Sequence, residues 1–353
     1  MFKFKLIFSV VFIGLLLFLA SKKFDSCDYV AQGYKVGLKE ITFNDANRNR
    51  EIKTAIWYPA ENSANTECIS HSIWKIGNVA KNAKILSGEI KYPLIMFSHG
   101  YGLDKWASSW FVHLLASQGY IVVTMDHYGN TQDNMSPYWS IRPFERARDI
   151  SFVLNKLLED KYWSQKIDKN RIGMAGYSQG GAASLWIAGA QTNYVNIVED
   201  HHKTTQAEKE AMYKLFKDQE SYEQELNNFE YDLANSSFKD TRIKAVFAMA
   251  PGIDEQFVYF NKFSDINIPV FIIAGDNDEI INADKNAKFY AAQIKNAHIK
   301  IIPEATHWTF LNEETFLGRI VEPKLIHDKA MSARIKDHEI VGDIALDFFE
   351  KNL

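Results

Sequence analysis

The sequence of 353 residues contains little cysteine and no excess of basic residues. Two cysteines cannot complete a four-ligand zinc site or hold an iron–sulfur cluster, although they can form one disulfide. Forty basic residues against 44 acidic ones give a formal net charge of −4. Nucleic-acid-binding proteins usually show a basic excess, so this balance argues against a nucleic-acid partner.

Long apolar runs are also scarce, and the one that stands out lies near the N-terminus. Residues 6–20 form an apolar run of 15 residues, with two lysines before it and two after it. This pattern is typical of a secretory signal, whereas a transmembrane helix usually needs about 17–25 apolar residues. Phe18 is large for the third position before a cleavage site after Ala20. Residues 1–24 are therefore expected to be either a signal peptide or an N-terminal membrane anchor.

Such a leader predicts export to a periplasmic or extracellular location, with membrane association through residues 6–20 if it stays attached. Export would place Cys27 and Cys68 in an oxidising compartment. Neither cysteine belongs to a C-x-x-C pattern or to a nucleophile motif. A bridge between them and two unpaired thiols both stay open.

The hydrophobic share of 46% is enough for a large core and excludes a disordered chain. After the leader, short apolar runs alternate with segments of helical spacing. This alternation predicts βαβ units and a mostly parallel sheet, an α/β fold. The expected strands are residues 34–43, 50–58, 93–98, 120–125, 171–175, 243–248, 270–274 and 299–302, and the expected helices are residues 106–118, 142–159, 182–190 and 337–351.

One segment, at about residues 191–240, interrupts the alternation. It carries 11 acidic and 5 basic residues, a net charge of −6. Its apolar residues fall near helical spacing, which predicts a helical insertion within a single domain of residues 25–353. The insertion is interpreted as either a lid over an active site or a peripheral decoration. The residues that give this spacing are Met212, Leu215, Phe216, Tyr222, Leu226 and Phe229.

The strongest chemical signal is the motif Gly-Tyr-Ser-Gln-Gly at residues 176–180. It follows an apolar strand and precedes a helix of small residues, which is the context that a G-x-S-x-G nucleophile turn requires. The glycines allow a tight turn that lifts the Ser178 hydroxyl above the edge of the sheet. We therefore predict that Ser178 is a nucleophile.

A serine nucleophile needs a histidine base, and the base needs an acid that fixes its tautomer. In this fold the order along the chain is serine, acid, histidine. His307 follows the last strand on a loop and is the predicted base. Asp278, shortly after the strand at 270–274, is the predicted acid, with Asp254 after the preceding strand as the alternative. His298 is expected before its strand, and His327 and His338 are expected to be solvated.

An oxyanion intermediate needs two backbone N–H donors. The amide of Gln179, directly after the nucleophile, is the first candidate. The second is the amide of Tyr101, in the loop Ser-His-Gly-Tyr-Gly that follows the strand at 93–98. His99, in the same loop, is interpreted as a structural histidine rather than a second base.

With these motifs in place, the chain resembles an α/β-hydrolase, and more narrowly the bacterial predicted dienelactone-hydrolase and platelet-activating-factor acetylhydrolase-like group. The resemblance covers about residues 35–350. Dienelactone hydrolases use a cysteine nucleophile, and Ser178 departs from that pattern. In the acetylhydrolase pattern the acid would match Asp254. The resemblance is carried by Ile-Trp-Tyr-Pro-Ala at 56–60, Phe-Ser-His-Gly-Tyr-Gly at 97–102, the helix from Arg142 to Leu154 with Asp149, Gly-Tyr-Ser-Gln-Gly-Gly at 176–181, and His-Trp-Thr-Phe-Leu at 307–311.

These residues predict a serine hydrolase that acts on small or lipid-like carboxylic esters and needs no metal or organic cofactor. A serine peptidase or amidase of the same fold is one alternative, although such enzymes usually carry a large extra domain. A non-catalytic binding protein of this fold and a membrane-tethered interaction protein are the others. Five aromatic residues near the loops are expected either to line an apolar acyl pocket or to belong to the core or the underside of the lid: Trp106, Trp110, Tyr138, Trp139 and Trp308.

Overall fold

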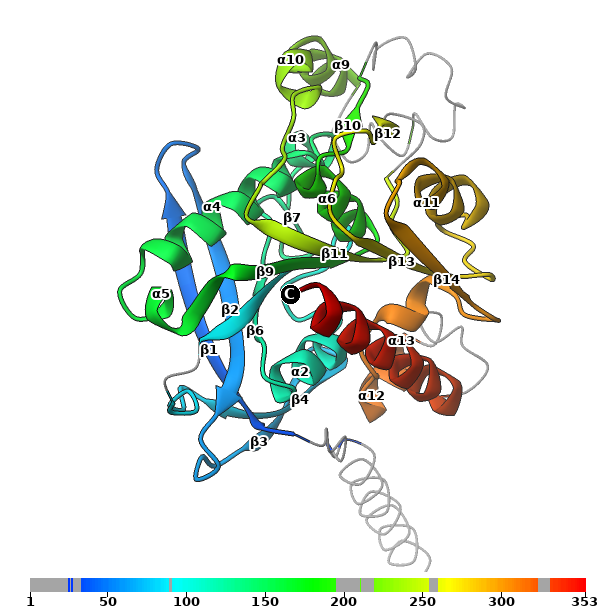
Figure 1. Cartoon of the computed structure of the whole chain (residues 1–353). Helices are drawn as coiled ribbons and strands as arrows, with labels where there is room; N and C mark the ends of the chain where they lie inside the picture. The colour runs from blue at the N-terminus through cyan, green and yellow to red at the C-terminus, as the bar shows by residue number, and fades with distance from the viewer. Residues whose placement is uncertain are drawn as a thin grey trace, which may run out of the picture.

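The computed structural model describes residues 25, 27, 33–88, 91–194, 210, 219–253, 260–322 and 331–353. Its centre is a ten-stranded sheet in the order β14-β13-β11-β9-β5-β6-β2-β1-β4-β3 (Figure 1). The strands are β1 (Lys35–Asp45), β2 (Arg50–Ala60), β3 (Glu67–His71), β4 (Trp74–Lys81), β5 (Tyr92–Ser98), β6 (Ile121–Met125), β9 (Ile167–Tyr177), β11 (Ile243–Met249), β13 (Val270–Gly275) and β14 (Ala297–Ile302).

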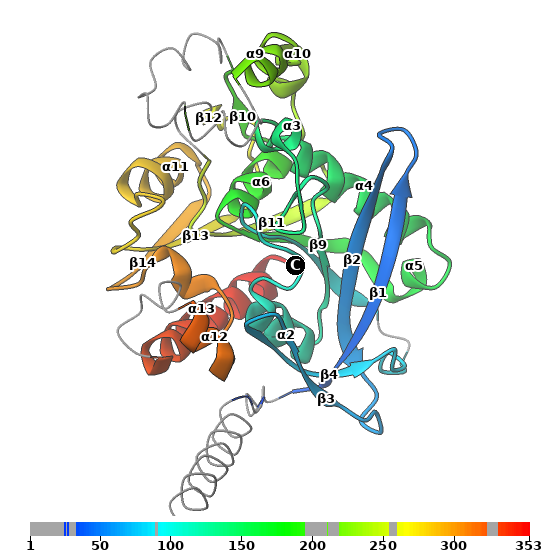
Figure 2. The same cartoon turned by 180° about the vertical axis from the view of Figure 1, so that it is seen from behind.

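The six strands from β14 to β6 are all parallel, so their carboxyl ends meet at one edge of the sheet. The strand β2 pairs antiparallel with both β6 and β1, and it forms with β1 the long hairpin opposite β13 and β14 in Figure 2. The predicted α/β fold with a mostly parallel sheet is confirmed. The parallel strands read as continuous apolar runs because both faces of this part of the sheet are covered.

Helices cover the sheet on both sides (Figure 1). On one side α4 (Glu145–Glu159) and α6 (Gln179–Ala188) pack against one cluster of buried side chains, which includes Ile150 and Trp186. On the other side α2 (Ser109–Ser117) and α13 (Met331–Asn352) pack against a second cluster, which includes Phe111 and Phe349. The molecule is therefore a three-layer structure with the sheet in the middle.

Several smaller elements surround this core. They are β7 (Asn130–Thr131), β8 (Asn134–Met135), α3 (Pro137–Ser140), α5 (Trp163–Lys166), β10 (Gln191–Thr192), α9 (Gln219–Asn227), α10 (Tyr231–Ala234), β12 (Phe260–Lys262), η1 (Asp284–Lys288), α11 (Phe289–Gln293), η2 (His307–Phe310) and α12 (Phe316–Val321). The hairpin β3–β4 and the helix α12 were not expected from the sequence, because both are short and carry no long apolar run.

The described part of the acidic insertion contains α9 and α10, which agrees with the predicted helical character. Phe229, between them, is buried against Phe144 and Tyr194. Met212, Leu215 and Phe216 lie outside the described residues, as do the side chains of Tyr222 and Leu226. The leader at residues 1–24 also lies outside them, and no helix within the described ranges is long and apolar enough to span a membrane.

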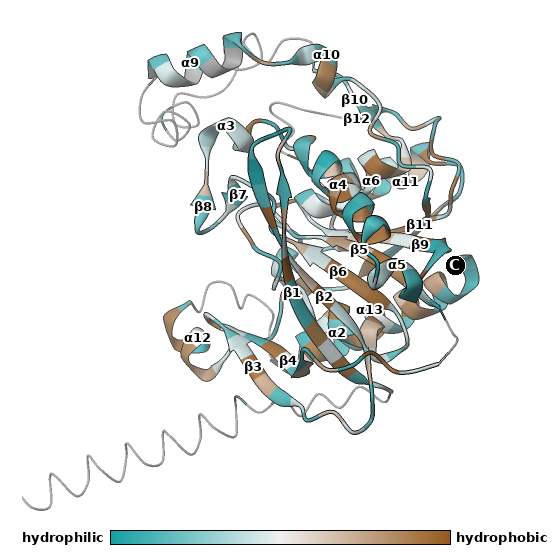
Figure 3. Ribbon diagram, turned by 90° about the vertical axis from the view of Figure 1, so that its left-hand side faces the viewer, coloured by the Kyte–Doolittle hydropathy of each residue, from teal (hydrophilic) through white to brown (hydrophobic). Residues whose placement is uncertain are grey.

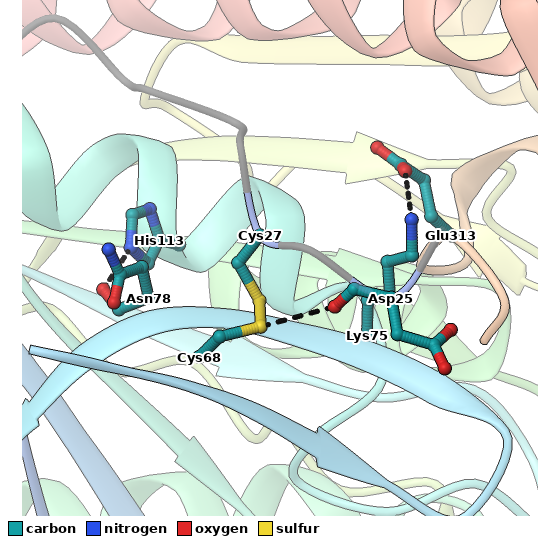
Figure 4. Close-up of a disulfide and its surroundings, with 7 residues drawn as sticks. All are labelled: Asp25, Cys27, Cys68, Lys75, Asn78, His113 and Glu313. Carbon is teal, nitrogen blue, oxygen red and sulfur yellow. Dashed lines mark hydrogen bonds and ion pairs between the residues drawn. A yellow bond between two sulfur atoms is a disulfide. The ribbon is translucent and has the colours of Figure 1, made fainter. Parts of the chain in front are cut away.

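A disulfide joins Cys27 to Cys68, which resolves the two possibilities left open by the sequence (Figure 4). Cys68 lies in β3 at the edge of the sheet, so the bridge ties the start of the chain to this edge. The side-chain carboxylate of Asp25 adds a second attachment, because it accepts a hydrogen bond of 2.7 Å from the amide of Phe316 at the start of α12.

We expect the double variant Cys27→Ser/Cys68→Ser to fold but to be less stable. The bridge closes a sequence separation of 41 residues, and loop-closure entropy for this length corresponds to a loss of up to about 4 kcal/mol in the free energy of unfolding. Urea unfolding of the variant and the oxidised wild type measures this difference. Equal midpoints and equal m-values would show that the bridge contributes no stability.

Candidate active site

Ser178 occupies a sharp turn between β9 and α6. Its φ of 55° and ψ of −120° are unusual for a residue with a side chain, because the Cβ then crowds the backbone. Hydrogen bonds hold the turn on both sides: the Ser178 amide donates to the Met249 carbonyl at 2.9 Å, and the Ser178 carbonyl accepts from the Ala182 amide at 3.0 Å. The predicted nucleophile turn is thus present at the carboxyl edge of the sheet.

Glycines make this turn possible because other backbone segments pass very close to it. A Cβ placed on Gly180 would lie 1.9 Å from the carbonyl oxygen of Ser98, and one placed on Gly176 would lie 2.2 Å from the carbonyl oxygen of Gly180. Both contacts are with backbone atoms, which cannot move aside as a flexible side chain can. Any larger residue at either position would displace the turn that presents Ser178.

The structure brings His307 to Ser178, as the sequence predicts. The His307 Nε2 atom lies 3.0 Å from the Ser178 Oγ atom. His307 is buried, with 4% of its surface exposed. The loop that carries His307 is held by the hydroxyl of Tyr177, which donates to the His307 carbonyl at 2.8 Å. A capping box between Thr306 and Thr309 fixes the short helix η2 that begins at His307.

Asp278 completes the arrangement. Its Oδ2 atom lies 2.7 Å from the His307 Nδ1 atom, while its Oδ1 atom accepts hydrogen bonds from the backbone amides of Ile280 at 2.9 Å and Ile281 at 2.7 Å. These contacts fix the carboxylate so that it accepts a hydrogen bond from the Nδ1–H group and leaves Nε2 free to face Ser178. Asp254, the alternative acid, lies outside the described residues.

The other late histidines that the structure describes, His298 and His338, do not join this group. His298 lies within β14 rather than before it, stacked on Phe271 with ring centroids 6.2 Å apart. The expectation of a solvated His338 is wrong: this residue is 1% exposed, stacks on Trp110 at 3.8 Å and bonds to the Thr309 carbonyl through Nε2. It is buried because α13 packs over α2. His327 lies outside the described residues.

The two predicted oxyanion donors belong to segments that adjoin Ser178. Gln179 is the first residue of α6, and the loop with His99, Gly100 and Tyr101 follows the end of β5. A Cβ placed on Gly100 would lie 3.3 Å from the Ser178 Cβ, so this loop passes directly beside the nucleophile. Tyr101 is 46% exposed, and its hydroxyl donates to the Ser140 hydroxyl at 3.3 Å. The donor roles of the Tyr101 and Gln179 amides stay predictions.

The buried Arg146 side chain, in α4, holds the back of this loop and was missed by the sequence analysis. Its guanidinium donates to the carbonyl of His99, to the carbonyl of Gly100 at 3.1 Å and to the side chain of Asn130. The carbonyls of His99 and Gly100 are both turned toward Arg146. In a trans peptide the N–H points opposite to the carbonyl, so the Tyr101 amide points away from Arg146. The sequence held a signal for this role, because Arg146 and Asp149 continue the helical spacing of the apolar residues that follow them in α4.

A second serine–histidine–aspartate chain lies entirely within the protein, behind the loop. His127 accepts from the Ser98 hydroxyl at Nε2, 2.8 Å away, and donates from Nδ1 to Asp149 at 3.1 Å. Burial, followed by the nearby Arg146 and Arg50 guanidinium groups, holds the pKa of His127 well below its usual value. Ser98 is 0% exposed, so no substrate can reach it, and this chain serves the structure rather than the reaction.

His99 behaves as the structural histidine that the sequence suggested. It is 1% exposed, its Nδ1 atom bonds to the Gly100 carbonyl at 2.7 Å, and its Nε2 atom accepts from the His127 amide at 3.3 Å. Burial, together with the charge of Arg146, holds its pKa well below the usual value. The ring is therefore neutral and ties two loops together.

A cavity of about 1130 Å³ opens beside the site. Gly102 and Leu103, after the predicted donor Tyr101, and Trp308, after the predicted base His307, all line it. The lining holds six carboxylate residues and two lysines, so its formal charge is negative. These charged residues are Glu40, Glu51, Asp104, Asp126, Asp133, Glu322, Lys53 and Lys105.

The five aromatic residues singled out in the sequence lie in three different settings. Trp106 and Trp308 line the cavity. Trp110 is buried, and its indole N–H donates to the Phe310 carbonyl at 3.0 Å. Tyr138 lies over the Arg142 guanidinium at 3.6 Å, and Trp139 over that of Arg50 at 4.7 Å, so both support the loop network instead.

The insertion touches this network rather than the cavity. Glu230, beside α10, accepts from the Arg142 guanidinium at 2.8 Å and from the Tyr138 hydroxyl at 3.3 Å. Within the ranges that the structure describes, the lining of the cavity includes no residue of the insertion, and no cluster of three or more metal-binding side chains occurs. The described part of the insertion thus contacts α3 and the segment that joins α3 to α4.

We expect Arg146→Gln to slow the reaction of Ser178 with a fluorophosphonate probe. The amide of Tyr101 would lose its fixed direction, and removal of one such donor costs up to about 10²–10³-fold in rate. The matched control is Arg48→Gln, because Arg48 belongs to the same charged cluster through Glu145 and Asp149 but donates to neither His99 nor Gly100. Time courses of labelling on folded protein give both rates. An equal fall in the labelling rate of the two variants would show that the loss of Arg146 slows labelling only by destabilising the protein.

Comparison with known proteins agrees with this geometry. The sequence model of the prolyl oligopeptidase family matches residues 106–315, and that of platelet-activating factor acetylhydrolase, isoform II, matches residues 74–136. Dipeptidyl-peptidase 5 of Porphyromonas gingivalis is 24% identical over 243 residues, which are 64% of this chain and 32% of that protein. This chain thus spans about a third of that relative's length.

Two other similar proteins are named as esterases or cutinases. A cutinase of Thermobifida fusca is 28% identical over 99 residues, 28% of each chain. The structure of a ferulic acid esterase from Streptomyces cinnamoneus superposes with a TM-score of 0.61 at 18% identity, covering 93% of this chain and 92% of the other, which shows the shared fold. Because the first family model spans more than half of the sequence, the chain belongs to the prolyl oligopeptidase family, among the serine hydrolases of the α/β-hydrolase superfamily.

Proposed function

We propose that the protein hydrolyses carboxylic esters through an acyl-enzyme formed on Ser178. The observation that carries this proposal is the contact chain from the Ser178 hydroxyl to His307 Nε2 at 3.0 Å and from His307 Nδ1 to Asp278 at 2.7 Å. A base within hydrogen-bonding distance of a hydroxyl, itself oriented by a buried carboxylate, is the arrangement that activates serine for acyl transfer.

In this mechanism Ser178 Oγ attacks the ester carbonyl while His307 Nε2 takes the hydroxyl proton. Asp278 stabilises the imidazolium that forms, and the amides of Tyr101 and Gln179 bind the oxyanion. His307 then gives its proton to the leaving alcohol as the carbon–oxygen bond breaks. Water, deprotonated by His307, attacks the acyl-enzyme and releases the acid by the same steps in reverse.

Two observations support an ester as the substrate. Proteins named as a ferulic acid esterase and as cutinases are among those similar to this chain. The cavity beside the site joins aromatic surface at Trp106 and Trp308 to a lining rich in carboxylates. Such a lining repels anionic groups and accepts hydrogen bonds from hydroxyls, which suits a small or lipid-like ester whose alcohol is neutral or cationic.

Peptide hydrolysis is the second candidate, because the chain belongs to the prolyl oligopeptidase family and is similar to a dipeptidyl-peptidase. The same three side chains would serve both reactions, since an amide also passes through a tetrahedral oxyanion. The two candidates differ in the leaving group that the cavity accommodates and that His307 protonates.

We expect Ser178→Ala to remove all enzyme-dependent hydrolysis of p-nitrophenyl butyrate and all labelling by a fluorophosphonate. Asp278→Asn should lower kcat by about 10⁴-fold, because the amide would favour the wrong tautomer of His307. Asp276→Asn is the matched control, since Asp276 bonds to the Glu304 amide and does not contact His307. Full activity in Ser178→Ala, or equal losses at positions 276 and 278, would contradict the assigned roles.

Ester and amide substrates with the same acyl group separate the two candidates. We expect p-nitrophenyl esters to be turned over and the corresponding p-nitroanilides to be untouched, as judged by kcat/KM. A dipeptidyl anilide cleaved as fast as the esters would favour a peptidase. Within the esters, a series from acetyl to palmitoyl defines the acyl preference, and a sharp fall beyond butyryl would exclude lipid-like substrates.

A further inference from the structure

The short helix α12 lies at the outside of the protein, and part of its ribbon has the hydrophobic colour in Figure 3. Leu317, Ile320 and Val321 are 62%, 64% and 56% exposed. The spacing of three and four residues places these side chains on one face of the helix. The other strongly exposed large apolar residues of the described ranges lie on several different elements and do not form such a set.

The opposite face of α12 is packed tightly, so the outward direction of the apolar face is fixed. A Cβ placed on Gly318 would lie 2.5 Å from the Ile73 carbonyl oxygen, at the tip of the hairpin β3–β4. The Thr315 amide donates to the same carbonyl at 2.7 Å, and the Thr315 side chain caps the helix by accepting from the Gly318 amide. The ion pair between Lys75 and Glu313, at 3.4 Å, joins the same two segments (Figure 4).

The chain that follows the leader is attached at this same place. Asp25 bonds to the Phe316 amide at the start of α12, and Cys27 is bridged to β3. In the sequence, Asp25 comes five residues after Ala20, the last residue of the apolar run. Five extended residues reach at most about 18 Å, so a bilayer that holds residues 6–20 must lie within that distance of α12. Lys22 and Lys23 fall within this connection, where anionic headgroups would attract them.

We propose that the apolar face of α12 rests in the surface of a lipid bilayer, as a second membrane contact beside the N-terminal anchor. An anchor alone leaves a domain free to rotate, whereas a second contact gives it one orientation. Val321 and the adjoining Glu322 also line the cavity beside the active site. This orientation therefore places the part of the cavity that Val321 and Glu322 line at the membrane surface. The proposal rests on a retained leader and not on the identity of the substrate.

A fluorescent label at position 320 tests the contact without reference to catalysis. Both cysteines of the chain are in the disulfide, so Ile320→Cys supplies the one reactive thiol for an environment-sensitive NBD label. The full chain is reconstituted into phosphatidylcholine–phosphatidylglycerol vesicles. We expect a blue-shifted emission that is quenched by lipids carrying a nitroxide near the headgroup. The matched control is a label at Phe289→Cys on α11, an exposed site near the opposite edge of the sheet, which should show neither effect.

A label at 320 that behaves like the label at 289 would overturn the proposal. So would a blue shift that nitroxide lipids do not quench, because protein rather than lipid would then cover α12.

The effect on the active site is measured with two fluorophosphonates, one soluble in water and one carried on a lipid chain within the vesicle. Leu317→Gln/Ile320→Gln should slow labelling of Ser178 by the lipid-borne probe several-fold and leave the soluble probe unaffected. The control Phe289→Gln/Ile299→Gln should change neither rate. An unchanged lipid-borne rate in the α12 variant would overturn the proposed orientation of the cavity.

Discussion

The strained turn at Ser178 is the constraint on which the rest of the site depends. A residue with a side chain at φ 55° stores on the order of 1–3 kcal/mol, which the surrounding structure must offset. The offset comes from the neighbouring strand, through the bond from the Ser178 amide to Met249, and from α6, through the bond to Ala182. The loop after β5 presses on the same turn at Gly180. Because three elements fix one residue, the nucleophile has one position relative to the sheet.

The residues beside Ser178 are held in place by contacts of their own. His307 and Asp278 lie on loops beyond β14 and β13, and hydrogen bonds from backbone amides and from the Tyr177 hydroxyl hold them. The loop of His99 and Gly100 is held from behind by the buried charge of Arg146. Burying a guanidinium is costly unless it finds partners, and here the carbonyls of His99 and Gly100 and the side chain of Asn130 accept hydrogen bonds from Arg146, with the charge of Asp149 nearby. Arg146 thus fixes the position of the loop that contains His99 and Gly100.

The sequence was informative wherever chemistry depends on local pattern. The turn at 176–180, the strand–helix alternation and the order of serine, acid and histidine all reflect short-range requirements, so the fold class and the three side chains at the site could be predicted. The hairpin β3–β4 and α12 could not, because they are stabilised by each other across more than 200 residues, as in the bond from Thr315 to Ile73. His338 was placed in solvent because its neighbours in sequence are charged, whereas its burial depends on Trp110.

These long-range contacts also determine which parts of the site the family match covers and which it does not. The family match covers residues 106–315, which include Ser178, Asp278 and His307. Part of the cavity lining comes from outside that range: Glu40, Glu51, Lys53, the segment His71–Trp74 at the tip of the hairpin β3–β4, the segment Gly102–Lys105, and Val321 with Glu322. A shared catalytic group determines that acyl transfer is possible, because the bonds that break and form at the serine are common to esters and amides. The choice between them depends on which leaving group binds beside His307, and that contact surface is built in part by segments outside the residues that the family model matches. Membership therefore accounts for the fold that brings Ser178, His307 and Asp278 together, while the specificity has to be argued from this chain's own cavity.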